Sequence, residues 1–559
     1  MRLDALFVNG RFHTVDAARP QARALGVIGE HIVGLDEELD GCSADVVYDL
    51  QGAPVVPGFH DAHYHMSSHG IDLANVRVTP DVAGTLDELY GVVKERATQL
   101  PAEAWVQGYG YEAFQLGGHP DPDALDRASG GRPVWLLQAS HHGGVASRSA
   151  LRRIGLGEGD DIPVIDGGYI GVGPDGRPNG VLAERANELV YTQIGPPDFE
   201  AFVEALGRGA REAVAMGLTS ITEPGIGGGS GSIADLAAFQ AARERGLLNL
   251  RVTVMPLINE LHKLAGDAPS GHSFGMDLGL RTGLGDDWLR IGGVKIVSDG
   301  ALGMRTAALC CDYTDVPGQR GFLLEDADAL RSNIVNAAAA GWQVATHAIG
   351  DLAVDTVLSA YEEARRAVPY NRMRHRIEHI GLATDEQIKR LHAADVIPVP
   401  QGRFLAEFGH SHLQALGEER GQLLFRQRGF LDGGLELPGS SDCPIVDGSP
   451  ILGLHALVNR EIPGGNVLNP AERLTPTQAL RAFTYGSAYA DHQEHRKGTL
   501  VRGKLADFVV LTDDPLQIAP KKIDSIRVAA TIVGGQIRHG ELAERHRKAP
   551  ERLTPQHAL

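Results

Sequence analysis

Histidine and carboxylate side chains recur at the ends of apolar runs that are typical of buried strands. The first such run, PVVPGFHDAHYH, ends in His63 and His65. Residues two apart in an extended strand point to the same side, so both imidazoles would face one place. Two imidazoles arranged in this way suit a single divalent metal ion. An accidental pair is the alternative, since the chain contains 23 histidines.

Two single histidines close later runs of the same kind. His347 lies in VATHAIGD and His379 lies in RIEHIG. An isolated histidine near a strand end is commonly structural, so neither is informative alone. If these strands belong to a barrel, their carboxyl ends converge on one site. Four converging imidazoles would repel one another when protonated, so a bound metal ion is the simplest explanation.

An aspartate and a lysine complete the candidate set. Asp442, in LPGSSDC, could contact a metal ion and accept a proton from its water, or cap a following helix, since Pro444 comes two residues later. Lys295 lies inside the apolar run GGVKIVSDG, where an unpaired ammonium is costly. Either it pairs with a carboxylate such as Asp299, or its neutral amine reacts with carbon dioxide. The resulting carbamate is an anionic ligand that can bridge two metal ions.

The elements that must position these residues alternate between strands and helices. Segments such as DTVLSAYEEARRAV have helical spacing and separate the apolar runs. Eight strand-then-helix units in order predict an α/β protein with a (β/α)₈ TIM-like barrel over residues 57–490. The stretch of about residues 67–211 is too long for one crossover and predicts an inserted subdomain. The eight expected strands are PVVPGFHDAHYH, GLTSITEP, LRVTVMPLI, LRIGGVKIVSDG, WQVATHAIG, HRIEHIG, VIPVPQ and LPGSSDC.

Both ends of the chain contain short strand-like runs in which apolar and polar residues alternate. Neither end has enough apolar surface for a domain of its own. We therefore expect residues 1–56 and residues 491–545 to be the two halves of one small β-sandwich. Residues 546–559 are highly charged and are expected to be a frayed tail.

Composition narrows the class of protein. With 559 residues the chain is too long for one compact core, and its net charge of −19 argues against nucleic-acid or anionic-membrane partners. We find neither a signal peptide nor an apolar run long enough to span a bilayer. The four cysteines have no metal-ligand spacing. We expect a cytoplasmic protein that acts on a small molecule, and a homo-oligomer is compatible with the sequence.

Five ordered motifs give the chain a family resemblance. PGFHDAHYH, VKIVSDGALGMRTAAL, THAIGD, RIEHI and GSSDCPI resemble the amidohydrolase superfamily, and more narrowly its YtcJ-like branch, which includes N-substituted formamide deformylases. The resemblance runs nearly end to end. It implies one or two divalent ions, usually zinc. The implied roles are one metal ion on His63 and His65, a second position on His347 and His379, a carboxylated Lys295 as bridge, and Asp442 as both ligand and proton shuttle.

The substrate pocket departs from the pattern of that branch. The usual SLGSRTA loop reads ALGMRTA at residues 301–307, and the Asn-Ser pair that commonly follows a histidine in the insert is missing after His142. His142 could line the pocket. Arg305 could bind a substrate carboxylate or oxyanion, or pair with Asp299. Glu184 could face the metal site or lie on a helix surface.

These features together predict metal-dependent hydrolysis of a C–N bond in an amide-like, non-peptide small molecule. Asp442 would accept the proton of the metal-activated water and return it to the departing nitrogen. The same site could instead act on a lactone, a carbamate or a deaminated heterocycle. A non-catalytic metal-containing binding protein is the alternative of another class. A purely structural site would be closed by four ligands, whereas this set leaves room for water and includes a spare carboxylate.

Overall fold

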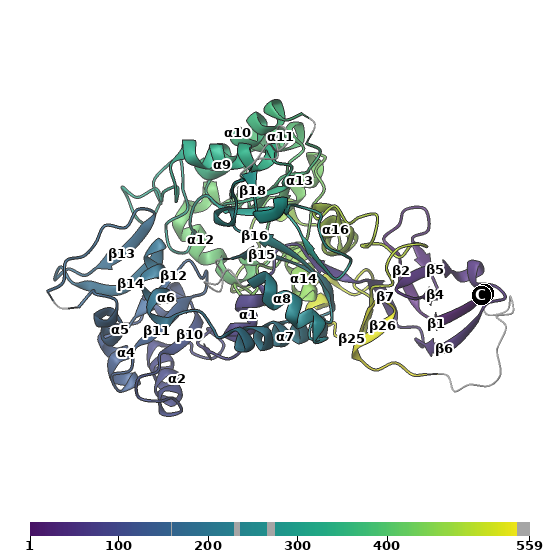
Figure 1. Ribbon diagram of the computed structural model, residues 1–559, viewed down its shortest axis with the longest axis horizontal. Coiled ribbons are helices and arrows are strands. Elements are labelled where there is room, and N and C mark those ends of the chain that lie inside the picture. Colours follow the sequence, from purple (N-terminus) through teal and green to yellow (C-terminus); the bar gives the residue numbers. More distant parts are fainter. Residues whose placement is uncertain (158, 228–234, 265–273, 370, 545–559) are drawn as a thin grey trace.

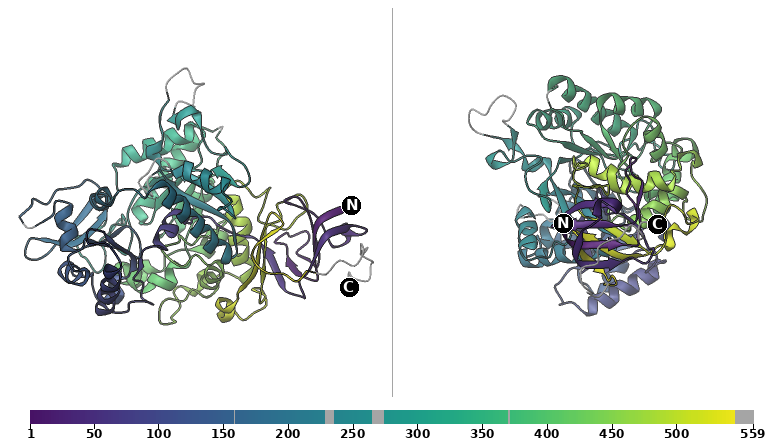
Figure 2. Two further views of the ribbon diagram at one scale, coloured as in Figure 1. Left: turned by 60° about the horizontal axis from the view of Figure 1, so that its bottom comes forward. Right: turned by 90° about the vertical axis from the view of Figure 1, so that its right-hand side faces the viewer.

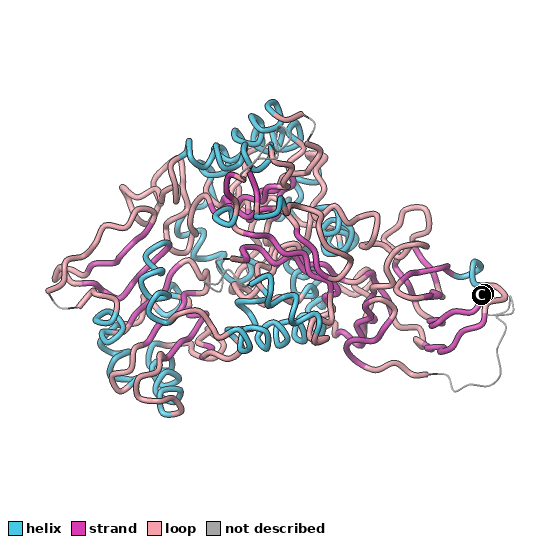
Figure 3. The backbone as a smooth tube through the Cα atoms, in the orientation of Figure 1, coloured by secondary structure: helices cyan, strands magenta, loops and turns pink. Residues whose placement is uncertain are grey.

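The computed structural model describes the chain except residues 158, 228–234, 265–273, 370 and 545–559. The described residues have a mixed α/β fold in which helices pack around central strands (Figures 1 and 3). The expected frayed tail, residues 546–559, lies outside the described residues. Among the helices that are described, none is both long enough and apolar enough to cross a membrane.

Two four-stranded parallel sheets form the centre of the fold. Their strand orders are β19-β16-β15-β8 and β20-β21-β22-β23. Most of these strands are buried on both faces, which fits their runs of Val and Ile without strict alternation. The bounds are β8 (Phe59–Asp61), β15 (Leu218–Ile226), β16 (Arg251–Pro256), β19 (Leu289–Ile291), β20 (Val294–Val297), β21 (Val344–Ala348), β22 (Arg376–His379) and β23 (Ile397–Val399).

Amphipathic helices separate these strands along the chain. In α10, for example, Val354, Val357 and Tyr361 recur at helical spacing and are buried against the core. The start of α11 is fixed by a capping box, because the Thr384 hydroxyl accepts from the backbone N–H of Gln387 while the Gln387 side chain accepts from that of Thr384. The bounds are α7 (Phe199–Ala215), α8 (Asp235–Glu244), α9 (Ala327–Ala339), α10 (Asp351–Ala367) and α11 (Asp385–Ala394).

Seven of the eight expected strand runs contain an assigned strand, but the eighth, LPGSSDC, does not. Pro438 has no N–H to donate, and Asp442 has a left-handed backbone (φ 64°), so a regular ladder cannot form there. The segment still lies beside the end of β8: the Ala62 N–H donates to the Gly439 carbonyl (3.0 Å), and the Asp442 N–H donates to the His63 carbonyl (2.8 Å). The expected strand is thus an irregular segment.

The helices that surround this segment complete the central part. Asp442 is not a helix cap, because the next helix, α14, begins at Pro450 with Ser449 as its N-cap. α12 contains a break at Gly417, whose φ of 75° is left-handed. The bounds are α1 (Met66–Asp72), α12 (Phe404–Gly421), α13 (Gln427–Asp432), α14 (Pro450–Asn459), α15 (Pro476–Arg481) and α16 (Ser487–Ala490), with the short strands β17 (His262–Lys263) and β18 (Phe274–Gly275).

A separate six-stranded sheet lies at one end of the molecule, with the order β13-β14-β12-β11-β10-β9 (Figure 1). Side chains of β11 alternate between the two faces of the sheet. Val134 and Leu136 pack into one hydrophobic core, and Trp135 packs into another. The bounds are β9 (Val76–Arg77), β10 (Val106–Tyr111), β11 (Val134–Gln138), β12 (Gly143–Ala146), β13 (Gly168–Val172), β14 (Pro178–Glu184), α2 (Leu86–Thr98), α3 (Ala113–Leu116), α4 (Pro122–Ser129), α5 (Arg148–Arg153) and α6 (Glu188–Ile194).

Two further sheets, built from both chain ends, lie at the opposite end (Figures 1 and 2). Their orders are β5-β4-β1-β6 and β26-β25-β24-β7-β2-β3. Phe7 and Phe508 meet edge to face in the core that the two sheets share, with ring centroids 4.8 Å apart. The bounds are β1 (Arg2–Val8), β2 (Arg11–His13), β3 (Gln21–Ala22), β4 (Leu25–Ile28), β5 (His31–Leu35), β6 (Ser43–Asp49), β7 (Pro54–Pro57), β24 (Phe508–Leu511), β25 (Val528–Val533) and β26 (Gln536–Gly540).

A buried ion pair joins these terminal sheets to the central strands. Arg251, the first residue of β16, is 1% exposed and donates two hydrogen bonds to Asp507, at 2.7 and 3.0 Å. It also contacts Glu30 at 3.0 Å. Because a charge buried without a partner is costly, both carboxylates hold the arginine at this junction.

We predict that Arg251→Ala destabilises the protein by about 3–5 kcal/mol, because it leaves the buried Asp507 carboxylate without its partner. Urea unfolding followed by circular dichroism measures this change. Arg245→Ala is the matched control: Arg245 pairs with Glu200 on the surface, so little change is expected. An unfolding midpoint in Arg251→Ala equal to that of the wild type would contradict the role assigned to this ion pair.

Candidate metal centre and active site

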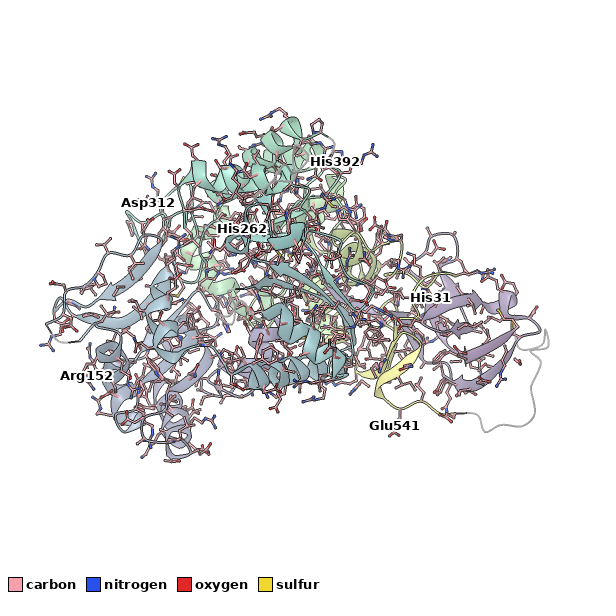
Figure 4. All side chains as sticks on the ribbon, in the orientation of Figure 1. His31, Arg152, His262, Asp312, His392 and Glu541 are labelled. Atoms are coloured by element: carbon pink, nitrogen blue, oxygen red, sulfur yellow. The ribbon has the colours of Figure 1, made fainter. Side chains whose placement is uncertain are left out.

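The candidate metal ligands gather where the central parallel strands end. His63 and His65 follow β8, and Asp442 lies in the irregular segment beside them. One cavity is lined by His65, Lys295, His347, His379 and Asp442, with His63 fully buried next to it. By contrast His31 and His392, labelled in Figure 4, lie in separate, outer parts of the molecule.

His63, His65 and Asp442 present three ligand atoms that lie within 4.8 Å of one another. The Asp442 Oδ1 atom is 3.4 Å from His63 Nε2 and 3.3 Å from His65 Nε2. Among the described residues, His63 Nε2 and Asp442 Oδ1 are buried and have no hydrogen-bond partner. Buried polar atoms normally have a partner, so this donor set fits a divalent cation placed between them.

His63 is held in this orientation by a carboxylate behind it. Its Nδ1 atom lies 2.5 Å from Glu378 Oε2, and this contact leaves Nε2 directed at Asp442. A carboxylate bonded to the second ring nitrogen is the usual way to orient a metal-binding histidine. Burial, together with the nearby Lys295, holds the pKa of His63 well below its usual range. The imidazole is therefore neutral, as a metal ligand must be.

Glu378 belongs to a fully buried network that our sequence analysis did not identify. Arg376 donates to both Glu378 oxygens, at 2.7 and 3.0 Å, and to Asp491 Oδ1 at 2.9 Å. Asp491 Oδ2 in turn accepts from Thr222 Oγ1 at 2.7 Å and lies 3.4 Å from His60 Nε2. The sequence RIEH contains a sign of this network. Arg376 and Glu378 are two residues apart on a buried strand, so their side chains lie on the same face.

His347 and His379 form the second pair of imidazoles, with ring centroids 4.4 Å apart. His347 Nε2 lies 3.3 Å from the Gly300 carbonyl and 3.4 Å from Asp299 Oδ1. His379 Nδ1 lies 2.8 Å from Gln401 Oε1. Burial lowers the pKa of both rings. Each neutral ring uses one nitrogen in these contacts, so its second nitrogen is available to a ligand.

Lys295 is buried in β20 without a paired carboxylate. It is 4% exposed, and burial lowers its pKa to about 8, while Glu378 and Asp442 partly oppose this shift. Within the described residues, no carboxylate lies at ion-pairing distance from its ammonium group. The alternative partner, Asp299, is engaged elsewhere. Its carboxylate accepts from the backbone N–H groups of Ala308, Ile349 and Gly350.

Two of the three candidate substrate-binding residues line the same cavity. His142 and Glu184 come from the six-stranded sheet region, and His142 Nδ1 lies 2.9 Å from Glu184 Oε2. The Thr306 hydroxyl donates to the other Glu184 oxygen at 2.6 Å. Burial alone would lower the pKa of His142, but the Glu184 carboxylate outweighs burial and raises it. The protonated form of His142 is therefore more stable at this position than in a free imidazole.

Arg305 is not brought to the cavity by the structure. Its guanidinium pairs with Asp315, and one of its nitrogens donates to the Leu302 carbonyl at 2.6 Å. The Arg305 guanidinium thus pairs with Asp315 and not with Asp299, and Arg305 is not among the described residues that line this cavity. Arg305 has a left-handed backbone (φ 59°), and its side chain contacts the carbonyls of Leu302 and Gly303 in its own loop.

Backbone strain is concentrated at the same place. Glu184, His379 and Asp442 have φ values of 54°, 68° and 64°, in the left-handed region that residues with a Cβ seldom adopt. Such conformations persist only where surrounding contacts enforce them, and they cluster at functional sites. The strained backbone at these three residues therefore supports a functional role for their side chains.

The chain is similar to known proteins over most of its length. Residues 46–539 match the sequence profile described as "Amidohydrolase family". The N-substituted formamide deformylase of Arthrobacter pascens is 29% identical over 96% of this chain and 98% of its own length. The putative amidohydrolase YtcJ of Bacillus subtilis is also 29% identical, over 87% of this chain and 89% of its own. These matches confirm the resemblance inferred from the motifs.

A plant relative and a solved structure extend the comparison. Protein LONG AFTER FAR-RED 3 of Arabidopsis thaliana is 30% identical over 95% of this chain and 91% of its own length. The crystal structure of an uncharacterized metal-dependent hydrolase from Pyrococcus horikoshii superposes with a TM-score of 0.72 at 25% identity, covering 92% of this chain and 99% of that one. The profile match spans most of the chain, and the chain belongs to the amidohydrolase family.

Proposed function

We propose that this protein is a metal-dependent hydrolase that cleaves a C–N bond of an amide-like, non-peptide small molecule. The observation that carries the proposal is the convergence of His63 Nε2, His65 Nε2 and Asp442 Oδ1, two of them buried without a hydrogen-bond partner in the described structure. The C–N bond is favoured by the similarity to an enzyme named for deformylating N-substituted formamides.

We further propose that the two parallel sheets are halves of one (β/α)₈ barrel over residues 57–490. Two links between them support this. A parallel bridge joins Leu257, just after β16, to Lys295 in β20. The irregular segment containing Gly439 is hydrogen-bonded to the end of β8 and lies next to the end of β23, where Gln401 donates to Ser440 Oγ at 3.1 Å.

The domain boundaries are proposed on similar grounds. Residues 1–56 and 491–545 would be the halves of a small β-sandwich, because their sheets share one apolar core. Residues of about 67–211 would be the inserted subdomain, which contains the six-stranded sheet. We also retain a cytoplasmic location and a small-molecule partner as parts of the proposal.

The ligand roles follow from the positions of the side chains. His63, His65 and Asp442 would hold one divalent ion. Zinc is suited to such histidine and carboxylate ligands. His347 and His379 would hold a second, and a carboxylated Lys295 would bridge the two. When bound, such an ion acidifies water and polarises a substrate carbonyl.

Asp442 would handle the proton. Its Oδ1 faces the two imidazoles of His63 and His65, while Oδ2 lies 3.7 Å from His379 Nδ1. In the proposed reaction, the Asp442 carboxylate accepts a proton from the attacking water. It then returns this proton to the departing nitrogen, because an unprotonated amine is a poor leaving group.

His142 would stabilise the charge that develops on the substrate carbonyl oxygen. It lines the cavity next to the metal ligands, with its ring 5.1 Å from that of His347. Glu184 favours its protonated form, so the ring can donate a hydrogen bond from Nε2 while Nδ1 remains with the carboxylate. A preorganised donor of this kind stabilises an oxyanion more strongly than water does.

Metal content is the first test. We expect about one or two divalent ions per chain in the purified wild type by elemental analysis, and a lower content in Lys295→Ala, which lacks the bridging group. Lys389→Ala is the matched control, since Lys389 lies on the surface of α11. A wild-type protein that is free of metal and cannot be loaded with it would refute the proposal.

Replacement of Asp442 separates metal binding from proton transfer. In Asp442→Asn, the amide oxygen can still face the metal, but the side chain no longer accepts a proton. We expect kcat on N-formyl amines to fall by about 10²–10⁴-fold while metal content is retained. The exposed Asp447→Asn serves as control. Wild-type turnover by Asp442→Asn would remove this residue from the mechanism.

Glu378→Gln tests the support behind His63. The substitution weakens the contact that orients the imidazole, so we expect affinity for zinc, measured by competition with a chromogenic chelator, to fall by about 10–100-fold. Glu363→Gln, which alters a surface carboxylate paired with Arg331, should leave affinity unchanged. Equal zinc affinity in Glu378→Gln and the wild type would show that His63 needs no such support.

A further inference from the structure

A second, mainly apolar cavity opens directly beside the proposed metal centre. His142, His379 and Asp442 line both cavities, so the two adjoin each other. Three phenylalanines form the wall of the second cavity: Phe404 and Phe408 from α12, and Phe425. The ring of Phe404 lies 5.7 Å from that of Phe408 and 5.8 Å from that of Phe425. A substrate bound at the metal could extend part of itself into this cavity, against the phenylalanine rings.

Besides Asp442, the carboxylate of Glu112 also lines this mainly apolar space. Glu112 is 5% exposed and precedes α3 in the six-stranded sheet region. Its oxygens accept from the backbone N–H of Gln115 at 3.1 Å and from Gln138 Nε2 at 3.3 Å. Among the described residues, no Lys, Arg or His lies at ion-pairing distance from it. A buried carboxylate without a cation is costly, and a cationic ligand would remove that cost.

The charged and titratable groups around Glu112 do not supply the missing cation. Arg305 is close enough to lower the pKa of Glu112 somewhat, although burial dominates and raises it. The Arg305 guanidinium is itself paired with Asp315. His142 lines the same cavity, but its Nδ1 atom pairs with Glu184 at 2.9 Å. A cationic group of a ligand can therefore pair with Glu112.

His412 adds a neutral acceptor to the same cavity. It is 5% exposed, and its Nδ1 atom has no hydrogen-bond partner in the described structure. Its ring packs 6.0 Å from the rings of both Phe408 and Phe425. Burial lowers the pKa of His412 to about 3, so it brings no positive charge that would compete with a bound cation.

We propose that this aromatic pocket binds a protonated amino group of the substrate, carried on an apolar segment, with Glu112 as its counter-ion. Aromatic faces attract cations, and a charge-assisted hydrogen bond to a buried carboxylate is among the stronger polar contacts. The substrate class would then be N-acylated diamines, with the acylated nitrogen at the metal centre and the free ammonium beside Glu112. This inference rests on the proposed amide hydrolysis.

A matched pair of substrates tests the preference. The N-formyl derivative of 1,4-bis(aminomethyl)benzene carries an ammonium group where N-formyl-4-ethylbenzylamine carries a methyl group of similar size. We expect kcat/KM of the metal-loaded wild type to be at least about tenfold higher for the ammonium compound. In Glu112→Gln the two values should become nearly equal. The glutamine oxygen can still accept the N–H of Gln115, so the cap of α3 is preserved.

A binding measurement separates this inference from the proposed reaction. Calorimetric titration of the same protein compares 4-ethylbenzylamine, which is protonated at neutral pH, with the uncharged 4-ethylbenzyl alcohol of similar size, and neither compound contains a scissile bond. The ammonium compound should bind at least about tenfold more tightly to the wild type and lose that advantage in Glu112→Gln. Glu103→Gln is the control, because the Glu103 side chain is 90% exposed in the same region of the chain.

The outcomes are distinct. A Glu112-dependent preference in both assays supports the inference. Preferential binding of 4-ethylbenzylamine over the alcohol without hydrolysis of either formamide supports the pocket and refutes the amide hydrolysis. Hydrolysis of both formamides at equal rates, or a preference that persists in Glu112→Gln, refutes the pocket and leaves the hydrolysis standing.

Discussion

The buried ion pair between Arg376 and Glu378 is the interaction on which the geometry of the candidate site depends. Both side chains are completely buried, so neither charge can be left without the other. Glu378 orients His63 toward Asp442, and Arg376 is anchored to Asp491 on its other side. Arg376 also donates to the Ala62 carbonyl at 2.6 Å, which fixes the backbone next to His63. One strand therefore sets the position of a ligand on another strand.

Sequence patterns predict the candidate ligands and their order along the chain, but not every element that holds them. Strand ends are readable because buried parallel strands are continuous apolar runs, and His63, His347 and His379 close such runs. The eighth run was wrong as a strand, since apolar character does not reveal that Asp442 takes a left-handed backbone. For Arg305 the sequence allows a substrate contact or a pairing with Asp299, because the position of Asp315, ten residues later, cannot be read from the sequence. Glu112 lies in the region of the six-stranded sheet, and its place beside the candidate site depends on tertiary packing that the sequence pattern does not reveal.

The two departures from the pattern of the YtcJ-like branch meet in the structure. A Cβ atom on Gly143 would lie 2.8 Å from the Met304 Cε atom and 2.6 Å from the Leu182 carbonyl. The loop that carries Met304 therefore packs against a strand that has no side chain at that point. Leu302 and Gly303, from the same loop, line the aromatic pocket. The altered loop and the altered segment after His142 thus pack against each other, and the shape of the pocket depends on both.

The pairing of β7 with β24 has a consequence for synthesis of the chain. Val55 lies opposite Val510 in this antiparallel pair, so one partner is translated long before the other. At the usual pace of translation, roughly 20–90 s separate the two strands. Until β24 emerges, the apolar edge of β7 is an open template for pairing with other chains. Closure of the terminal sheets is thus a late step in the synthesis of the protein. A chain that is truncated before Phe508 keeps this edge of β7 permanently unpaired.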